Sequence, residues 1–238
     1  MKLKRKIREF VRNFGIDIAK YTADTRGIDS YHDIFQIINC EKPMIFDIGA
    51  NTGQTITNFR EVFKNCTINS FEPSPSTFEI LKKNSSKMEN VQIWNTGSGS
   101  SVSTLLLNEN TGSDMSSFLE LGQAGWGEIK NKTEVAVTTI DQFCQDQNIE
   151  IIDILKIDTQ GYEHEVFKGA VNSILENRIG LLYFEVTFID MYKGLPSFST
   201  LYDFAVNHGF ELVAIYPIKY KNNKAGWTDV LFKHKNYK

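Results

Sequence analysis

From residue 44 onward, short apolar segments alternate with amphipathic segments, and this alternation constrains the fold more than any other feature of the sequence. The apolar segments predict strands, and the amphipathic ones, such as residues 55–65, predict helices. Such a pattern is typical of βαβ units in a mostly parallel sheet. The last two predicted strands, residues 210–217 and 227–233, have no helix between them, so we expect them to pair antiparallel at one edge of the sheet.

Two stretches depart from this alternation. Residues 1–42 are predicted to be helical, with a break near residues 22–30, and to form an N-terminal helical cap on one domain over residues 43–238. Residues 98–134 are rich in Gly, Ser and Asn, and we expect an insertion that carries a hairpin and contributes to function. Residues 162–175 are predicted to form one continuous helix.

Composition restricts the partners. A formal charge of −3 and a pI near 5.9 disfavour a nucleic-acid substrate. Three separated cysteines without a CxxC pair argue against disulfides or a zinc site and fit a reducing cytoplasm. No apolar run is long enough to span a membrane. The basic start, MKLKRKIREF, has a helical pattern; a solvated face is the simpler interpretation, and weak peripheral contact with anionic lipid is the alternative.

The stretch IFDIGANTGQT, residues 45–55, connects the first predicted strand to a helix through a glycine-containing turn. In an open α/β sheet, ligands bind at the carboxyl ends of the strands. Gly49 and Gly53 permit a tight turn and close approach of a ligand, and Asn51 tolerates a left-handed conformation. Asp47 places a negative charge beside the turn, which would repel a pyrophosphate but suit a cationic ligand.

Glu72 ends the second predicted strand about 20 residues beyond the glycines, where a carboxylate accepts hydrogen bonds from ribose hydroxyls. This feature suits any adenosine ligand, whereas Asp47 favours one with a sulfonium and an ammonium group, which is S-adenosylmethionine. Residues 45–55 match neither the GxGxxG motif of dinucleotide-binding proteins nor the P-loop motif. Structural roles in capping the turn or ending a strand remain the simpler interpretation of each residue taken alone.

The order of several motifs resembles the FkbM family of S-adenosylmethionine-dependent O-methyltransferases, from about Pro43 onward. The matching stretches are FDIGANTGQT, FEPSPSTFEILKKN, VTTIDQF, ILKIDTQGYEHEVFKGA, LYFEVTFIDMYKGLPSFSTLYDFAVNHGF and TDVLF. The resemblance implies a Rossmann-like class I methyltransferase fold: a three-layer sandwich whose seven-stranded, mostly parallel sheet has an antiparallel edge strand. It also implies that the cofactor is bound by Asp47, Gly49, Asn51, Gly53 and Glu72, with Gly97 and Ser98 near the adenine.

The sequence departs from the family pattern at Thr159 and Gln160, where many members resemble Val-Glu. An acidic role at that position is therefore not expected here.

Two acids end neighbouring predicted strands and are the main catalytic candidates. Asp158 follows a buried strand and Glu185 lies one strand further, so both should face the cleft. Asp158 is expected to orient the methionyl end or the acceptor hydroxyl, and Glu185 and His164 are rival general bases. The His164 side chain is more simply explained as a surface histidine. For Glu163, a structural hydrogen bond and a catalytic role are equally open. Asp158 and Glu185 could instead share a divalent metal, although none is predicted.

Trp126 in the insertion and Tyr192 after the fifth strand are candidates to line an acceptor pocket, because an aromatic face packs well against a sugar. Packing of the insertion onto the body is the simpler role for Trp126.

The sequence therefore predicts a cytoplasmic O-methyltransferase that acts on a hydroxyl of a glycan, sugar or secondary metabolite, and it does not predict the oligomeric state. The alternatives are an NAD(P)-dependent oxidoreductase and a non-catalytic cofactor-binding subunit.

Overall fold

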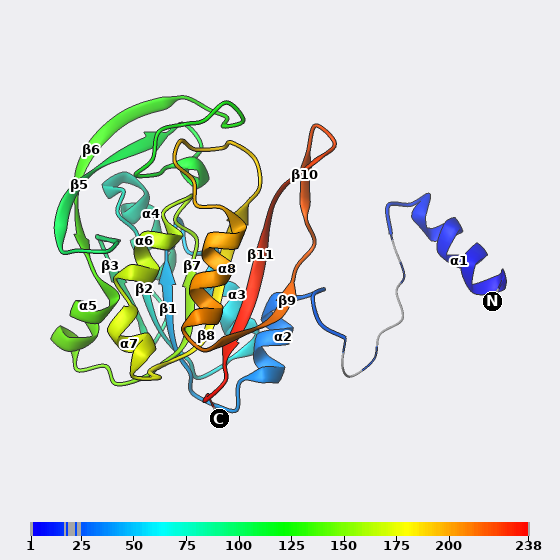
Figure 1. The fold of residues 1–238 in the computed structure, drawn as a ribbon, viewed down its shortest axis with the longest axis horizontal. Helices are drawn as coiled ribbons and strands as arrows, with labels where there is room; N and C mark the ends of the chain where they lie inside the picture. Colours follow the sequence, from blue (N-terminus) through cyan, green and yellow to red (C-terminus); the bar gives the residue numbers. More distant parts are fainter. Residues whose placement is uncertain (1, 17, 19–21, 23–24, 238) are drawn as a thin grey trace.

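The computed structural model describes residues 2–16, 18, 22 and 25–237, and it centres on a mixed eight-stranded sheet (Figure 1). The strand order is β10-β11-β8-β7-β1-β2-β3, and β9 pairs with β11. The pairs from β8 to β3 are parallel. The strands of this main sheet are β1 (Met44–Ile48), β2 (Thr67–Phe71), β3 (Val91–Trp94), β7 (Ile152–Ile157), β8 (Ile179–Thr187), β9 (Phe210–Ile215), β10 (Lys219–Lys221) and β11 (Lys224–His234).

Strands β9 and β10 share one edge of the main sheet. β10 pairs with the start of β11 and β9 with its end, both antiparallel. The expected antiparallel pairing of the last two strands is therefore confirmed, but β11 lies inside the sheet, since it also pairs antiparallel with β8. Because β9 and β10 occupy one position, the eight strands form seven positions across the sheet, consistent with the predicted class I methyltransferase sandwich.

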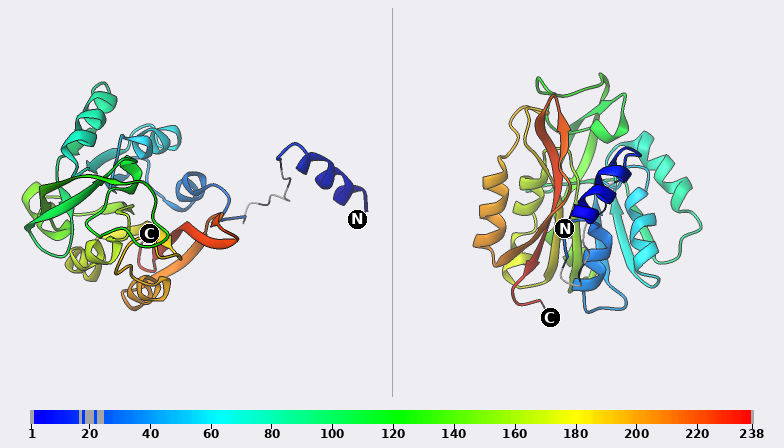
Figure 2. Two further views of the ribbon diagram at one scale, coloured as in Figure 1. Left: turned by 90° about the horizontal axis from the view of Figure 1, so that it is seen from above. Right: turned by 90° about the vertical axis from the view of Figure 1, so that its right-hand side faces the viewer.

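Helices cover both faces of the sheet and complete three layers (Figure 2). Apolar side chains of the helices pack on each face in a separate core, represented by Phe59 against Ile45 and by Phe167 against Phe184. The helices of one face are α2 (Ser30–Ile37), α3 (Gln54–Val62) and α4 (Pro75–Ser85). Those of the other face are α5 (Ile140–Gln147), α6 (Glu163–Lys168), α7 (Val171–Leu175) and α8 (Phe198–Asn207).

The prediction of one helix over residues 162–175 is wrong, because the segment is divided into α6 and α7. The break coincides with Gly169, where an added Cβ would lie 2.0 Å from the carbonyl oxygen of Gly99. Close packing against a segment distant in sequence therefore requires glycine here and interrupts the helix. The helix that follows β2 is capped by Ser74, whose hydroxyl accepts a hydrogen bond from the Thr77 N–H at 3.3 Å.

The segment that was expected to be an insertion forms most of a second, three-stranded sheet. It consists of β4 (Gly97–Ser98), β5 (Ser103–Asn110) and β6 (Ile129–Thr138), with the short 3₁₀ helix η1 (Ser113–Met115) between β5 and β6. β5 and β6 pair antiparallel as a long hairpin. β6 continues past residue 134 to Thr138, so this strand extends beyond the expected insertion and belongs to the second sheet.

The N-terminal segment contains α1 (Lys2–Arg12) and α2. α2 packs into the body: Ile34 is fully buried, and the Tyr31 ring lies 5.0 Å from that of Phe59 on α3. The division into a cap and a domain at residue 42 remains a prediction. Part of the predicted helical stretch and of its break, residues 17, 19–21 and 23–24, lies outside the described residues. Among the residues described, no helix is long and apolar enough to cross a bilayer.

Candidate functional site

A cavity that is partly open to solvent lies at the carboxyl ends of β1, β2 and β7, between the main sheet and the insertion, with about 630 Å³ of empty space including that open part. It brings together six residues that the sequence predicted for a site, and the 3₁₀ helix and the loop after it close one side. The predicted residues among its lining are Gly49, Asn51, Glu72, Gly97, Ser98 and Asp158.

The loop after β1 forms the floor of this cavity. Gly49 has φ of 80°, and a Cβ there would lie 1.9 Å from the carbonyl oxygen of Asp158, so only glycine fits. Asn51 takes a left-handed conformation with φ of 47°, as expected. Gly53, with φ of 97°, precedes α3 and does not line the cavity. Its role in this geometry is to let the chain turn into α3.

Glu72 is held at the end of β2 with one face toward the cavity. Its side chain is buried and accepts hydrogen bonds from the backbone N–H groups of Asn51 and Ser74, both at 2.9 Å. Burial raises the pKa of the Glu72 carboxyl to about 7, although these two hydrogen bonds oppose the shift. The two hydrogen bonds hold the carboxyl group in place. A ligand that donates further hydrogen bonds to it would favour its ionised form.

Asp47 does not line the cavity, contrary to the reasoning that placed a free anion there. It is fully buried, and its Oδ1 lies 2.9 Å from the ammonium of Lys156. The two residues are direct partners in the parallel pairing of β1 and β7. Lys156 Nζ also donates to the carbonyl oxygen of Gly49 at 3.1 Å. Asp47 therefore neutralises the buried ammonium group of Lys156 beneath the glycine loop. Any effect of Asp47 on a ligand in the cavity passes through Lys156 and that loop.

Lys156 is a functional residue that the sequence interpretation missed. It lies two positions before Asp158, so the two side chains share a face of β7, and Nζ lies 3.7 Å from Asp158 Oδ2. The pKa of Lys156 stays above its ordinary value because Asp47 and Asp158 outweigh the effect of burial. A lysine in the middle of the apolar stretch IIDILKID was the signal for such a pair.

Carboxyl groups from three strands lie near one another beside the cavity: Asp158 after β7, Glu185 on β8 and Asp229 on β11. Asp158 lines the cavity, whereas Glu185 and Asp229, which are paired residues of β8 and β11, do not. The pKa of Glu185 lies well above its usual value because of burial and the negative charge of Asp158 and Glu163. The pKa of Asp229 is raised to about 6, mainly by burial. The negative region that the sequence attributed to Asp47 is thus formed by these acids.

Gln160 connects two of these carboxylates and was missed as a functional residue. Its Nε2 donates to Asp158 Oδ1 at 2.8 Å and to Glu185 Oε2 at 3.1 Å. The backbone is left-handed at this residue, with φ of 55°. The hydroxyl of Tyr192 donates to Gln160 Oε1 at 2.8 Å and thereby fixes the orientation of the amide. Tyr192 is fully buried, so it positions Gln160 and does not line the cavity.

Glu163 holds the loop that carries Gln160. Its Oε1 accepts hydrogen bonds from the Thr159 N–H, the Thr159 hydroxyl and the Gly161 N–H, at 3.0 to 3.1 Å. Of the two roles left open for Glu163, this geometry supports the structural one.

Two buried polar atoms in the cavity lining have no hydrogen-bond partner among the residues described: Ser98 Oγ and Asn51 Oδ1. Buried polar groups are rarely left unpaired, so a polar ligand in this cavity would satisfy them. Gly97 also lines the cavity, and a Cβ there would lie 2.8 Å from the Phe118 ring. These features fit a nucleoside-containing cofactor such as S-adenosylmethionine.

The insertion is fixed over the cavity by hydrogen bonds at both ends. Glu109 on β5 accepts hydrogen bonds from the hydroxyls of Ser74 and Ser76 at the start of α4. The Ser117 hydroxyl donates to the Gln160 carbonyl oxygen at 2.7 Å. Trp126 lies further out, 37% exposed, with its ring 5.4 Å from that of Trp227. This contact supports packing onto the body as its role.

The prediction that His164 supplies a base gains no support from its position. The residue lies on α6, its ring packs against Phe204 of α8 at 5.9 Å, and it does not line the cavity. The described residues contain no group of three or more His, Cys, Asp or Glu side chains placed to hold a metal ion. Between Asp158 and Glu185, the position considered for a shared metal is occupied by the Gln160 amide.

The sheet order and the cavity at its carboxyl edge are those of the class I methyltransferase fold. A solved FkbM methyltransferase from Methylobacillus flagellatus KT superposes with a TM-score of 0.55 at 14% identity, over 86% of this chain and 48% of that one. The chain thus spans about half of that protein. Residues 47–212 match the methyltransferase FkbM domain, so the chain belongs to the FkbM methyltransferase family.

A second solved structure shares the fold, and a curated protein matches most of the chain. TrmK from M. capricolum, solved with S-adenosyl-homocysteine, has a TM-score of 0.52 at 12% identity, over 89% of this chain and 71% of that one. The 2-O-methyltransferase NoeI of Sinorhizobium fredii is 21% identical over 226 residues, which are 90% of this chain and 88% of NoeI. The predicted family, enzyme class and cofactor are confirmed, and the oxidoreductase and non-catalytic alternatives are set aside.

Proposed function

We propose that this methyltransferase methylates a hydroxyl oxygen of a sugar-containing or otherwise hydroxylated small molecule. The observation that carries the proposal is the pair of carboxylates, Asp158 and Glu185, which the Gln160 amide joins at the end of the cofactor cavity. S-adenosylmethionine, when bound, supplies an electrophilic methyl group on a positively charged sulfur. The chain must then orient a hydroxyl and accept its proton.

Glu72, Asn51 and Ser98 are the residues we propose for the nucleoside part of the cofactor. Glu72 keeps unused lone pairs on both oxygens beside its two backbone hydrogen bonds, so it can accept from ribose hydroxyls. Asn51 Oδ1 and Ser98 Oγ supply the remaining unpaired polar atoms. The negative charge at the other end of the cavity favours the cationic sulfonium.

Asp158 is the residue we propose to orient the acceptor hydroxyl. Its side chain is 40% exposed, it lines the cavity, and Lys156 lies 3.7 Å away. On methyl transfer the hydroxyl proton would pass to a neighbouring carboxylate: Asp158 lines the cavity, and the Gln160 amide joins it to Glu185. Holding the reactants in line contributes up to roughly 7–11 kcal/mol, and proton transfer adds a smaller gain.

An oxygen acceptor is supported by NoeI, whose name states 2-O-methylation. A nucleic-acid acceptor is disfavoured by the acidic side chains at the cavity, which would repel phosphates. The described cysteines Cys40, Cys66 and Cys144 are unpaired, which supports a cytoplasmic location.

The experiment separates binding from turnover with two conservative variants, Asp158→Asn and Glu185→Gln. Candidate glycans, glycolipids and metabolites are incubated with isotopically labelled S-adenosylmethionine, and methylated products are identified by mass spectrometry. Both variants should retain S-adenosylhomocysteine binding by isothermal titration, while turnover falls by about 10² or more. Asp203→Asn, an exposed acid on α8, is the matched control. Transfer to nitrogen or carbon, or full turnover in both variants, would refute the proposal.

A further inference from the structure

Helix α1 exposes a continuous apolar face. Ile7, Phe10, Val11 and Phe14 are spaced at helical intervals along α1 and the turn after it, and they therefore share one side. Ile7, Phe10 and Phe14 are 49%, 63% and 68% exposed. The rings of Phe10 and Phe14 lie edge to face, 5.3 Å apart. In the figures, α1 lies apart from the sheet and the helices that cover it (Figures 1 and 2). Water is a poor environment for such a face.

The same segment is strongly basic. Six of the 26 basic residues but only one of the 29 acidic residues of the chain lie in residues 1–14, which gives this segment a formal charge of +5. The whole chain carries −3, so the remainder carries −8. Arg5, Lys6, Arg8 and Arg12 are exposed, and the helical spacing puts the three arginines on the side away from Phe10 and Phe14. The charge is thus concentrated on the helix that carries the apolar face.

We propose that α1 lies in the surface of a bilayer that contains anionic phospholipid. The aromatic and aliphatic face enters the boundary between headgroups and acyl chains, and the basic side chains contact the negatively charged headgroups. An 11-residue helix is far too short to span a bilayer, so it lies along the surface. Charge complementarity argues for this occupant, because the segment carries +5 and the headgroups are anionic. A second copy of the chain is tested as a separate outcome.

The proposal is tested by flotation of the full chain with vesicles of phosphatidylcholine, with or without roughly one third phosphatidylglycerol. We expect binding only to the anionic vesicles, and at least about tenfold weaker binding in high salt, because salt screens the attraction. Phe10→Ser with Phe14→Ser should reduce binding by about tenfold or more through loss of the apolar face. Lys2→Glu with Lys6→Glu should do the same by reversing charge.

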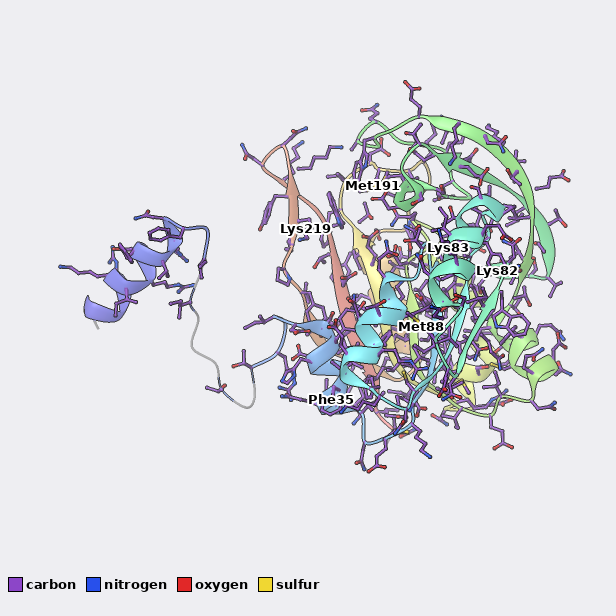
Figure 3. The ribbon with its side chains drawn as sticks, turned by 180° about the vertical axis from the view of Figure 1, so that it is seen from behind. Phe35, Lys82, Lys83, Met88, Met191 and Lys219 are labelled. Atoms are coloured by element: carbon purple, nitrogen blue, oxygen red, sulfur yellow. The ribbon has the colours of Figure 1, made fainter. Side chains whose placement is uncertain are left out.

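Matched control variants lie on the body of the protein. Lys82→Glu with Lys83→Glu on α4, labelled in Figure 3, makes the same change in net charge at an exposed helix. Leu175→Ser removes an apolar side chain on the body whose exposure, 65%, matches that of Phe10, 63%. Both controls should bind anionic vesicles like the unaltered chain, and every variant should retain S-adenosylhomocysteine binding, which reports an intact fold.

Three results would overturn the proposal. One is the absence of binding to anionic vesicles. Another is equal loss of binding in the α4 controls, which would show a net-charge effect. The third is a different occupant: dimers in sedimentation velocity that Phe10→Ser with Phe14→Ser abolishes, or tighter binding of an RNA oligonucleotide than of the vesicles.

Discussion

Changing Gln160 to glutamate would place a third carboxyl group between Asp158 and Glu185. In the structure, the Gln160 amide donates one hydrogen bond to each of these carboxylates, at 2.8 and 3.1 Å. Glutamate has nearly the same shape, but when ionised it has no proton to donate. Gln160→Glu therefore replaces two attractive contacts by repulsion without changing the packing around Tyr192.

The expected size follows from these two contacts. A hydrogen bond to a charged group contributes about 1.5–3 kcal/mol, so losing both should lower the free energy of unfolding by roughly 3–6 kcal/mol at pH 8. The neighbouring acids raise the pKa of the new carboxyl group in the folded protein above its unfolded value. Below the unfolded pKa the group keeps its proton in both states and can donate again. The loss of stability therefore grows as pH rises, and it should be smaller at pH 6 than at pH 8.

Urea unfolding at pH 6 and pH 8 measures this effect, and Gln142→Glu provides the matched control. Gln142 Nε2 also donates to a carboxylate, that of Asp146 at 2.8 Å, but the pair lies on the surface of α5, where the same change should cost less than about 1 kcal/mol. Three carboxyl groups also form a donor set that Mg²⁺ accepts, so Mg²⁺ should raise the midpoint of Gln160→Glu and not that of the unaltered protein. Equal losses in the two variants, or a loss independent of pH, would refute the bridging role of Gln160.

Three further predictions concern the buried charges. Lys156→Met should lower the free energy of unfolding by about 3–5 kcal/mol in urea, because Asp47 would be buried without its cation; a loss below about 1 kcal/mol would contradict the pairing. Glu72→Gln should weaken S-adenosylhomocysteine binding by about 10- to 150-fold in isothermal titration and lower the free energy of unfolding by about 1–3 kcal/mol, because its NH2 group would face one of the two backbone N–H donors; unchanged affinity would remove Glu72 from the site. Burial raises the pKa of Glu72 and Glu163 to about 7, so the folded protein binds more protons and its stability declines between about pH 4.5 and 7. The urea midpoint should be higher at pH 6 than at pH 8, and the reverse order would show that other groups dominate.

The alternation of strands and helices was sufficient to predict the sheet, because each element carries its own apolar pattern. The glycine loop and Glu72 were also predictable, since the turn and the strand end are local features. The break at Gly169 was not, because it depends on contact with Gly99, 70 residues away in the chain. Local periodicity contains no information about such a contact.

The partners of the charged residues beneath the site were also not predictable from local sequence. The sequence indicated that Asp47 lies beside the loop, but its partner is on β7, and only the strand order brings Lys156 next to it. The amide of Gln160 was noted as a departure from an acid, yet its role depends on Glu185 from another strand and on the hydroxyl of Tyr192. Site chemistry that joins several strands requires the tertiary arrangement.

The hydrogen bond from Ser117 to the Gln160 carbonyl ties the hairpin of β5 and β6 to the amide that spaces the two acids. Ser116, Ser117 and Phe118 of the same segment also form a wall of the cofactor cavity. A hairpin exchanged in evolution to suit a new acceptor would therefore have to preserve both this wall and one hydroxyl at the position of Ser117.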